Sequence, residues 1–164
     1  SRPALPIWPR ITEPTSWNRC YVADELLLDT GALVSILDRS QSGHGAFAAF
    51  FDGWPGPVVT SEAVLTEATH LLGRFRGGAD ACLAFVLHGG ATVVPSTASS
   101  LGRCRALMRR YGDLPMDLAD ATLVLLAEEL RTDLVLTTDR RHFEAYRIAG
   151  QRRFRMLPDG QQGQ

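Results

Sequence analysis

The sequence predicts an α/β fold with a central, mainly parallel sheet that is covered by helices on both faces. Short runs rich in leucine or valine alternate along the chain with longer segments whose apolar residues recur at helical spacing. Such alternation is typical of parallel sheets, because a crossover helix must return the chain to the starting edge before the next strand. The length of 164 residues suits one domain with a sizeable core.

Five strands are expected, because short runs of leucine, valine or threonine recur between turn-forming residues. They cover residues 25–28, 58–60, 91–94, 134–136 and 154–157. The first of them contains Leu26-Leu27-Leu28 without a polar interruption, so we expect it to be buried. A turn at residues 54–57, with two prolines and a glycine, precedes the second strand.

Seven helices are expected between and after these strands. They cover residues 31–39, 42–52, 62–73, 79–88, 97–111, 117–131 and 140–146. The second helix carries Phe47, Phe50 and Phe51, which we expect either in the core or at a contact between two copies of the chain. Ser61 is placed to cap the third helix. The sixth helix is apolar almost all round and must therefore be deeply buried.

The domain is expected to span residues 23–158. Residues 1–22 hold four prolines and no periodic pattern, which indicates a tail or an arm against the domain, and residues 159–164 look like a frayed end. No apolar run approaches the roughly 20 residues of a membrane span, so no membrane association is expected. The three cysteines are far apart and form no metal-binding spacing, which favours a reducing, cytoplasmic compartment.

Four acidic residues fall where a parallel sheet would bring them together. Asp29 and Asp139 each follow an apolar strand. Glu67 shares the core-facing stripe of its helix, and Asp120 lies in the first turn of the most apolar helix. Several carboxylates in one partly buried place repel one another unless a cation or a shared proton relieves the repulsion. This pattern indicates a metal-dependent enzyme.

Each acid also has a purely structural explanation. Asp29, Asp117 and Asp139 are placed to cap the helices that follow them. Glu67 would be satisfied by a buried ion pair with an arginine. A helix dipole contributes about 0.3–1 kcal/mol to an aspartate such as Asp120, which is less than the several kcal/mol that desolvation of a lone carboxylate costs. Asp120 therefore needs a further partner, and a divalent ion would serve.

The chemistry of the candidate ligands favours Mg²⁺ or Mn²⁺, because hard cations prefer oxygen ligands and the four histidines show no zinc-binding spacing with the acids.

The chain contains no lysine. This excludes a P-loop nucleotide-binding site and weighs against phosphoaspartate receivers and haloacid-dehalogenase-type phosphatases. Positive charge for a nucleic acid must come from arginines. The candidates are Arg103, Arg105, Arg109, Arg110, Arg140, Arg141, Arg147, Arg152, Arg153 and Arg155. About half of them are expected to be solvated or paired with Glu128, Glu129 and Glu144.

The acids and their neighbours resemble the motifs of the PIN domain family, and in particular of the VapC-type ribonuclease toxins of bacterial toxin–antitoxin modules. The similar segments are Leu27-Leu28-Asp29-Thr30-Gly31-Ala32-Leu33, Thr66-Glu67, Leu118-Ala119-Asp120-Ala121-Thr122-Leu123 and Leu136-Thr137-Thr138-Asp139. The resemblance covers roughly residues 25–157. The proline-bearing N-terminus departs from the family, whose members often begin almost at the first strand.

The resemblance implies a three-layer α/β/α fold, a Mg²⁺ or Mn²⁺ site, cleavage of single-stranded RNA and a homodimer with an antitoxin partner. Asp29, Glu67, Asp120 and Asp139 take the places of the four family acids, and Asp117 is a nearby acid that would bind metal through water. Thr30 and Thr137 resemble the small polar companions of these acids, and together with Arg140 and Arg141 they are the candidate substrate-binding residues. The alternative is a PIN-like module without catalytic activity that binds RNA or protein.

Overall fold

The computed structural model describes residues 24–159, which include almost the whole expected domain. The expected N-terminal arm at residues 1–22, Cys20 within it, and all but the first residue of the expected C-terminal end lie outside the described residues.

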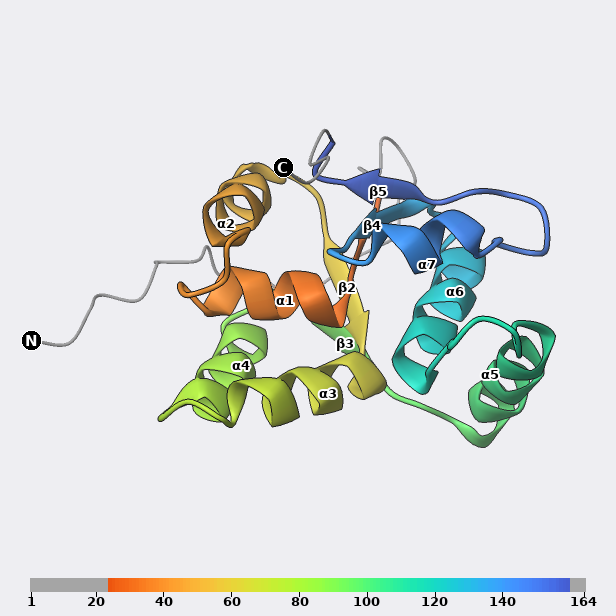
Figure 1. Cartoon of the computed structure of the whole chain (residues 1–164), viewed down its shortest axis with the longest axis horizontal. Coiled ribbons are helices and arrows are strands. Elements are labelled where there is room, and N and C mark those ends of the chain that lie inside the picture. Colours follow the sequence, from red (N-terminus) through yellow and green to blue (C-terminus); the bar gives the residue numbers. More distant parts are fainter. Residues whose placement is uncertain (1–23, 160–164) are drawn as a thin grey trace, which may run out of the picture.

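A five-stranded parallel sheet forms the centre of the described chain (Figure 1). Its strands are β1 (Leu26–Leu28), β2 (Val58–Ser61), β3 (Thr92–Val94), β4 (Leu134–Leu136) and β5 (Arg155–Leu157). Their order across the sheet is β3-β2-β1-β4-β5, and every neighbouring pair is parallel. The chain therefore builds outward from β1 in one direction, returns to the other side of β1 and continues in the opposite direction. The predicted fold class is confirmed.

The helices are α1 (Thr30–Leu37), α2 (His44–Gly53), α3 (Glu62–Leu72), α4 (Gly78–Leu87), α5 (Ala98–Arg110), α6 (Leu118–Leu130) and α7 (Arg140–Ala145). Right-handed crossovers place α1 to α4, which connect β1 to β3, on one side of the strands, and α5 to α7 on the other. Figure 1 shows these two groups of helices with the sheet between them. The two groups and the sheet make up the three layers.

The predicted helix at 31–39 was too long at its end, and the predicted helix at 42–52 began too early. Helix α1 stops at Leu37 because Asp38 has an extended backbone and its carboxylate binds the backbone and side chain of Ser40. Such a local turn competes with a further helical turn. The following residues form turns, and α2 begins only at His44.

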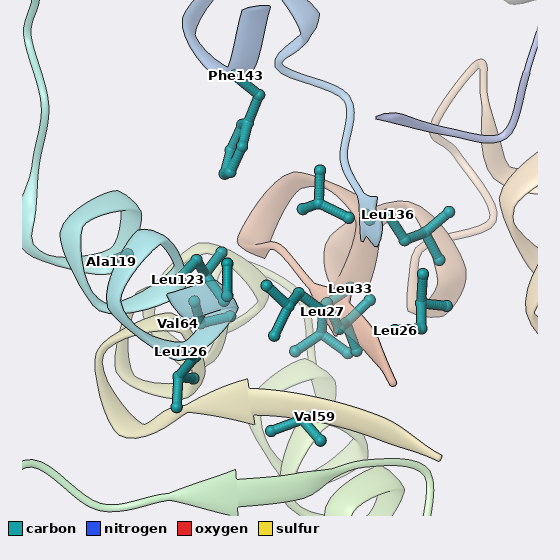
Figure 2. Packing of buried hydrophobic residues seen from close by; sticks show 14 of the residues in the cluster. Leu26, Leu27, Leu33, Val59, Val64, Ala119, Leu123, Leu126, Leu136 and Phe143 are labelled. Carbon is teal, nitrogen blue, oxygen red and sulfur yellow. The ribbon is translucent and has the colours of Figure 1, made fainter. Parts of the chain in front are cut away.

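The core lies between the sheet and the helices that cover it (Figure 2). All three leucines of β1 are fully buried, as are Val135 and Leu136 of β4. In α6, every residue from Ala119 to Ala127 except Asp120 is buried, which confirms that this helix is covered on nearly all sides. Cys82 and Cys104 are buried free thiols. Among the phenylalanines of α2, Phe47 and Phe51 belong to the core.

The register of the central strands determines which side chains meet at the carboxyl edge of the sheet. Leu28 pairs with Leu136, so the residues that follow them, Asp29 and Thr137, are neighbours across the two strands. The backbone N–H of Asp29 donates to the carbonyl of Leu136 at 3.1 Å. The carboxyl ends of β1 and β4 mark the point where the strand order reverses, which is where open α/β sheets bind their ligands. None of the described helices is both long and apolar enough to cross a lipid bilayer.

The start of α4 offers a test of the packing. A Cβ atom on Gly78 would lie 2.0 Å from the backbone oxygen of Leu72, so Gly78→Ala should lower the free energy of unfolding by about 1–3 kcal/mol. Gly102, inside α5, has no neighbouring atom within 4 Å of such a Cβ, and Gly102→Ala should raise the free energy of unfolding by about 0.4–1 kcal/mol. Urea unfolding measures both changes. Equal effects of the two substitutions would contradict the placement of α4 against Leu72.

Candidate active site

The four predicted acids come from four different elements that converge at the carboxyl edge of the sheet. Asp29 follows β1 directly, and Asp139 follows β4 after two threonines. Glu67 lies in the middle of α3, which begins where β2 ends, and Asp120 lies in the first turn of α6. The charges of Asp29, Asp120 and Asp139 act on one another, since Asp120 and Asp139 both raise the pKa of Asp29. The structure thus brings these three acids within electrostatic reach.

Asp29 is the most buried of the four, with only 6% of its surface exposed. Its carboxylate does not cap α1, although it precedes that helix. Instead, Oδ2 accepts a hydrogen bond from the hydroxyl of Thr137 at 2.6 Å. Burial raises the pKa of Asp29 to about 7, against the hydrogen bond from Thr137, and the negative charges of Asp120 and Asp139 raise it further. An anion at this position is therefore costly without a nearby cation.

Glu67 is half-buried and faces α1, whereas its neighbours Thr66 and His70 on the same helix are exposed. The hydroxyl of Thr30, the first residue of α1, donates a hydrogen bond to Oε2 of Glu67 at 2.8 Å. Within residues 24–159, no arginine forms an ion pair with Glu67, so the buried ion pair considered from the sequence is not present there. Thr30 thereby supports Glu67 as Thr137 supports Asp29.

Asp120 is half-buried at the start of α6. Its backbone N–H donates to the carboxylate of Asp117 at 2.9 Å, which confirms Asp117 as the exposed cap of this helix. Oδ2 of Asp120 accepts a hydrogen bond from the phenol of Tyr146 at 2.9 Å. Burial raises the pKa of Asp120 to about 6, and the charge of Asp117 contributes to the rise. No local sequence pattern points to Tyr146, because its contact with Asp120 spans 26 residues and depends on how α7 ends.

Asp139 lies at the start of α7 and makes two side-chain contacts there. It caps α7, since Oδ1 accepts a hydrogen bond from the backbone N–H of His142 at 3.1 Å. Its other oxygen, Oδ2, lies 2.5 Å from Nδ1 of His142. The backbone N–H of Asp139 donates to the hydroxyl of Thr137 at 2.9 Å, so Thr137 connects Asp139 with Asp29. The spacing of three residues between Asp139 and His142 was visible in the sequence, but the prediction did not include His142.

The donor atoms of this site fit a hard divalent cation better than zinc, because they are carboxylate and hydroxyl oxygens. Burial, and to a smaller extent the charges of neighbouring acids, raises the pKa of Asp29 and of Asp120, and a bound cation would offset both effects. The carboxylates do not form a closed cage: in the described range, no group of three or more histidine, cysteine, aspartate or glutamate side chains is close enough to hold a metal ion as it stands.

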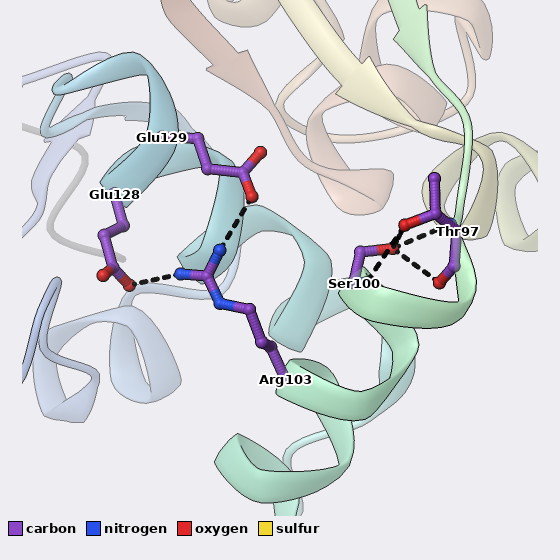
Figure 3. A network of polar contacts seen from close by, with 5 residues as sticks. All are labelled: Thr97, Ser100, Arg103, Glu128 and Glu129. Carbon is purple, nitrogen blue, oxygen red and sulfur yellow. Dashed lines mark hydrogen bonds and ion pairs between the residues drawn. The ribbon is translucent and has the colours of Figure 1, made fainter.

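The candidate arginines differ in how far their charge is already neutralised. Arg103 of α5 forms ion pairs with Glu128 and Glu129 of α6, at 3.1 and 2.9 Å (Figure 3). Arg155 pairs with Asp133 at 2.9 Å, and Arg147 donates to three backbone carbonyls, including that of Glu144. The expected pairing with Glu128 and Glu129 is therefore confirmed for Arg103, whereas Arg147 and Arg155 are held by groups that the prediction did not include.

Two arginines adjoin the acidic site directly, because α7 begins immediately after Asp139. The guanidinium of Arg140 donates to the backbone carbonyl of Pro158. Arg141 is exposed, and no carboxylate of the described chain forms an ion pair with it. Arg141 thus offers its whole charge to solvent beside the acidic edge.

The strand order, the three layers and the acidic carboxyl edge define a PIN-like α/β/α fold. The PIN domain family model matches residues 26–149. The chain is also 35% identical over 136 residues to Ribonuclease VapC26 of Mycobacterium tuberculosis, an alignment that covers 81% of this chain and 100% of that protein. The chain therefore belongs to the PIN domain family and is of the VapC type.

Solved structures of three other proteins share this fold. Mycobacterium tuberculosis VapC20, described as a sarcin–ricin loop cleaving toxin, superposes with a TM-score of 0.63 at 23% identity, covering 71% of this chain and 91% of that one. A toxin from a Klebsiella pneumoniae toxin–antitoxin complex gives 0.55 at 18% identity, with 72% and 89% covered. VapBC2 of Rickettsia felis, bound to a promoter DNA fragment, gives 0.56 at 13% identity, with 82% and 99% covered.

The raised pKa of Asp29 predicts how stability depends on pH in protein treated with EDTA. Asp29 has a pKa of about 7 in the folded state, against the ordinary value of 3.8 in the unfolded state. At pH values between these two, the folded state therefore binds a proton that the unfolded state has lost. The free energy of unfolding should therefore fall as the pH rises from about 5 to 8, by up to about 3 kcal/mol. Urea unfolding across this range measures the decline.

Asp29→Asn should remove most of this decline, because an amide does not titrate. Asp38 is a matched control: hydrogen bonds from Gln41 and Ser40 lower its pKa, so its titration lies below this pH range. Asp38→Asn should shift the free energy of unfolding by a similar amount at every pH between 5 and 8. A decline that persists unchanged in Asp29→Asn would show that Asp29 is not the group responsible.

Proposed function

We propose that this protein is a Mg²⁺- or Mn²⁺-dependent endoribonuclease that cleaves single-stranded RNA, and that it acts as the toxin of a toxin–antitoxin module. The observation that carries the proposal is the convergence of Asp29, Asp120 and Asp139. Burial raises the pKa of Asp29 to about 7, and the charges of Asp120 and Asp139 add to the rise. Such a cluster of carboxylates is costly to the folded protein unless a bound cation offsets the cost. The 35% identity to a ribonuclease of the VapC type supports the same reaction.

Asp29, Glu67, Asp120 and Asp139 would hold the cation, and Asp117 would contribute through a water molecule. When bound, a divalent ion of this kind lowers the pKa of a bound water and neutralises charge on the phosphate that is attacked. The residues of the chain itself supply alignment. Thr137 holds Oδ2 of Asp29 and Thr30 holds Oε2 of Glu67, so each of these acids keeps its other oxygen for the cation.

RNA must approach an acidic edge, which requires positive charge beside it. Arg141 is best placed to meet a phosphate, because its guanidinium is exposed and adjoins Asp139 by sequence. Arg140 would assist from the preceding position while its bond to Pro158 orients it. Thr30 and Thr137 act on the substrate indirectly in this proposal, because their hydroxyls already donate to the acids.

The proposed function also implies a partner protein, an oligomeric state and a location for this chain. An antitoxin protein would bind this chain, as in the toxin–antitoxin complexes of similar fold from Klebsiella pneumoniae and Rickettsia felis. Homodimerisation and a cytoplasmic location are proposed with it, since a toxin that cleaves cellular RNA must meet its substrate there. The buried, unpaired thiols of Cys82 and Cys104 are compatible with a reducing compartment.

Replacement of an acid should separate this enzyme from a PIN-like module that only binds. Asp120→Asn should lower the rate of cleavage of single-stranded RNA by more than about 100-fold. Loss of a residue that only orients a metal ligand typically costs about 10- to 100-fold, and loss of a ligand itself should cost more. The fold should survive, because the amide can still accept from Tyr146. Asp52→Asn, at an exposed position of α2, should leave the rate unchanged.

The same assay should respond to metal. EDTA should abolish cleavage by the wild type, millimolar Mn²⁺ should restore it, and Mn²⁺ should raise the melting temperature of the wild type more than that of Asp120→Asn. RNA binding without cleavage, unaffected by EDTA or Mn²⁺, would instead establish the non-catalytic module.

The exposed charge of Arg141 predicts a change in the salt dependence of RNA binding. Arg141→Ala should weaken the binding of a single-stranded RNA and reduce the slope of log K against log salt by about 0.7, the value of one lost phosphate contact. Arg103→Ala is the matched control, since its charge is already neutralised by Glu128 and Glu129. Fluorescence anisotropy at several salt concentrations measures both slopes. Equal slopes in the two variants would remove Arg141 from the RNA contact.

A further inference from the structure

Tyr146 is a buried phenol whose one polar atom contacts an acid of the candidate site. The side chain has no exposed surface, and its hydroxyl donates to Oδ2 of Asp120 at 2.9 Å. A buried phenol requires a hydrogen-bond partner, but a backbone carbonyl would satisfy it as well as a carboxylate. The partner here is the half-buried acid at the start of α6, which needs support against its own desolvation.

The ring of Tyr146 is held from several sides, so the direction of its hydroxyl is fixed. Tyr111 and Phe143 meet it edge to face, with ring centroids 5.2 and 5.5 Å away. His142 stacks on it at 6.4 Å, with an angle of 15° between the ring planes. A side chain packed in this way has lost its rotational freedom on folding, and its hydroxyl can therefore fix another group at little further cost in entropy.

The same short segment supports a second acid. Helix α7 begins at its cap, Asp139, and ends at Tyr146, and His142 within it contacts Oδ2 of Asp139 at 2.5 Å. Asp139 and Asp120 are therefore connected through His142 and Tyr146, whose rings stack on each other.

We propose that Tyr146 is a positioning residue that fixes the carboxylate of Asp120 relative to Asp139, and so prepares the pair to hold a divalent cation. This inference rests on the proposed function, because it concerns the same acids. The phenol occupies Oδ2 of Asp120 and leaves Oδ1 to the cation. Groups that orient metal ligands in this way typically change metal affinity or activity about 10- to 100-fold when they are removed.

The test compares two tyrosines of one aromatic cluster. Tyr146→Phe removes the hydroxyl that contacts Asp120. Tyr111→Phe removes a hydroxyl that accepts a hydrogen bond from the backbone N–H of Arg147 at 2.9 Å and contacts none of the four acids. Both variants lose one hydrogen bond of similar length next to the same rings.

Binding of Mn²⁺ without RNA is measured by calorimetry, and kcat and KM are measured on a single-stranded RNA. Tyr146→Phe should weaken Mn²⁺ binding at least about tenfold and lower kcat at subsaturating Mn²⁺, with KM for RNA unchanged. Tyr111→Phe should change neither quantity. Wild-type Mn²⁺ affinity in Tyr146→Phe, or an equal loss in Tyr111→Phe, would overturn the positioning role while leaving the proposed function intact. A wild-type protein that does not bind Mn²⁺ would overturn both.

Two further replacements of Tyr146 keep the test decisive if the phenylalanine variant folds poorly. The residue 4-aminophenylalanine retains a hydrogen-bond donor at the position of the hydroxyl, whereas 4-methylphenylalanine fills the same volume without a donor. The amino variant should bind Mn²⁺ with an affinity close to that of the wild type, and the methyl variant should bind it about tenfold more weakly. Equal affinities in these two variants would show that Tyr146 only fills space.

Discussion

The repulsion between carboxylates at the carboxyl edge of the sheet is the constraint on which the candidate site depends. Asp29 is almost completely buried beside β4, and Asp120 and Asp139 act on its charge, so its pKa rises to about 7. Neutral donors reduce this cost only in part: the hydrogen bond from Thr137 lowers the pKa of Asp29, yet burial dominates. The protein retains an unfavourable arrangement of charge, which is reasonable only where a cation completes it.

Three polar side chains of the site act as supports, and each comes from an element other than that of the acid it holds. Thr137 after β4 holds Asp29 after β1, Thr30 of α1 holds Glu67 of α3, and Tyr146 after α7 holds Asp120 of α6. Because each bond crosses between elements, the positions of the acids depend on the packing of the whole sheet and its helices. The fully buried leucines of β1 and the apolar α6 provide the rigid frame that this requires.

Positive charge is distributed so that little of it enters the acidic edge. Arg103 and Arg155 are neutralised on the surface by glutamates and aspartates, and Arg147 serves backbone carbonyls near the end of α7. An arginine placed among the acids would remove the repulsion and with it the affinity for a cation. Exposed Arg141 lies at the border, where it would attract a phosphate without neutralising Asp29.

The sequence alone determined the order of the elements, the parallel sheet and the four acids, because strands, helices and their caps are set by local spacing and by residues close together in the chain. It also indicated that Asp120 needed a partner. Only the tertiary structure decided that Tyr146 is this partner, that Thr30 supports Glu67 and that Arg103 is already paired. These contacts join residues 25 or more positions apart, and they depend on register, crossover geometry and the direction of side chains, which no local pattern encodes.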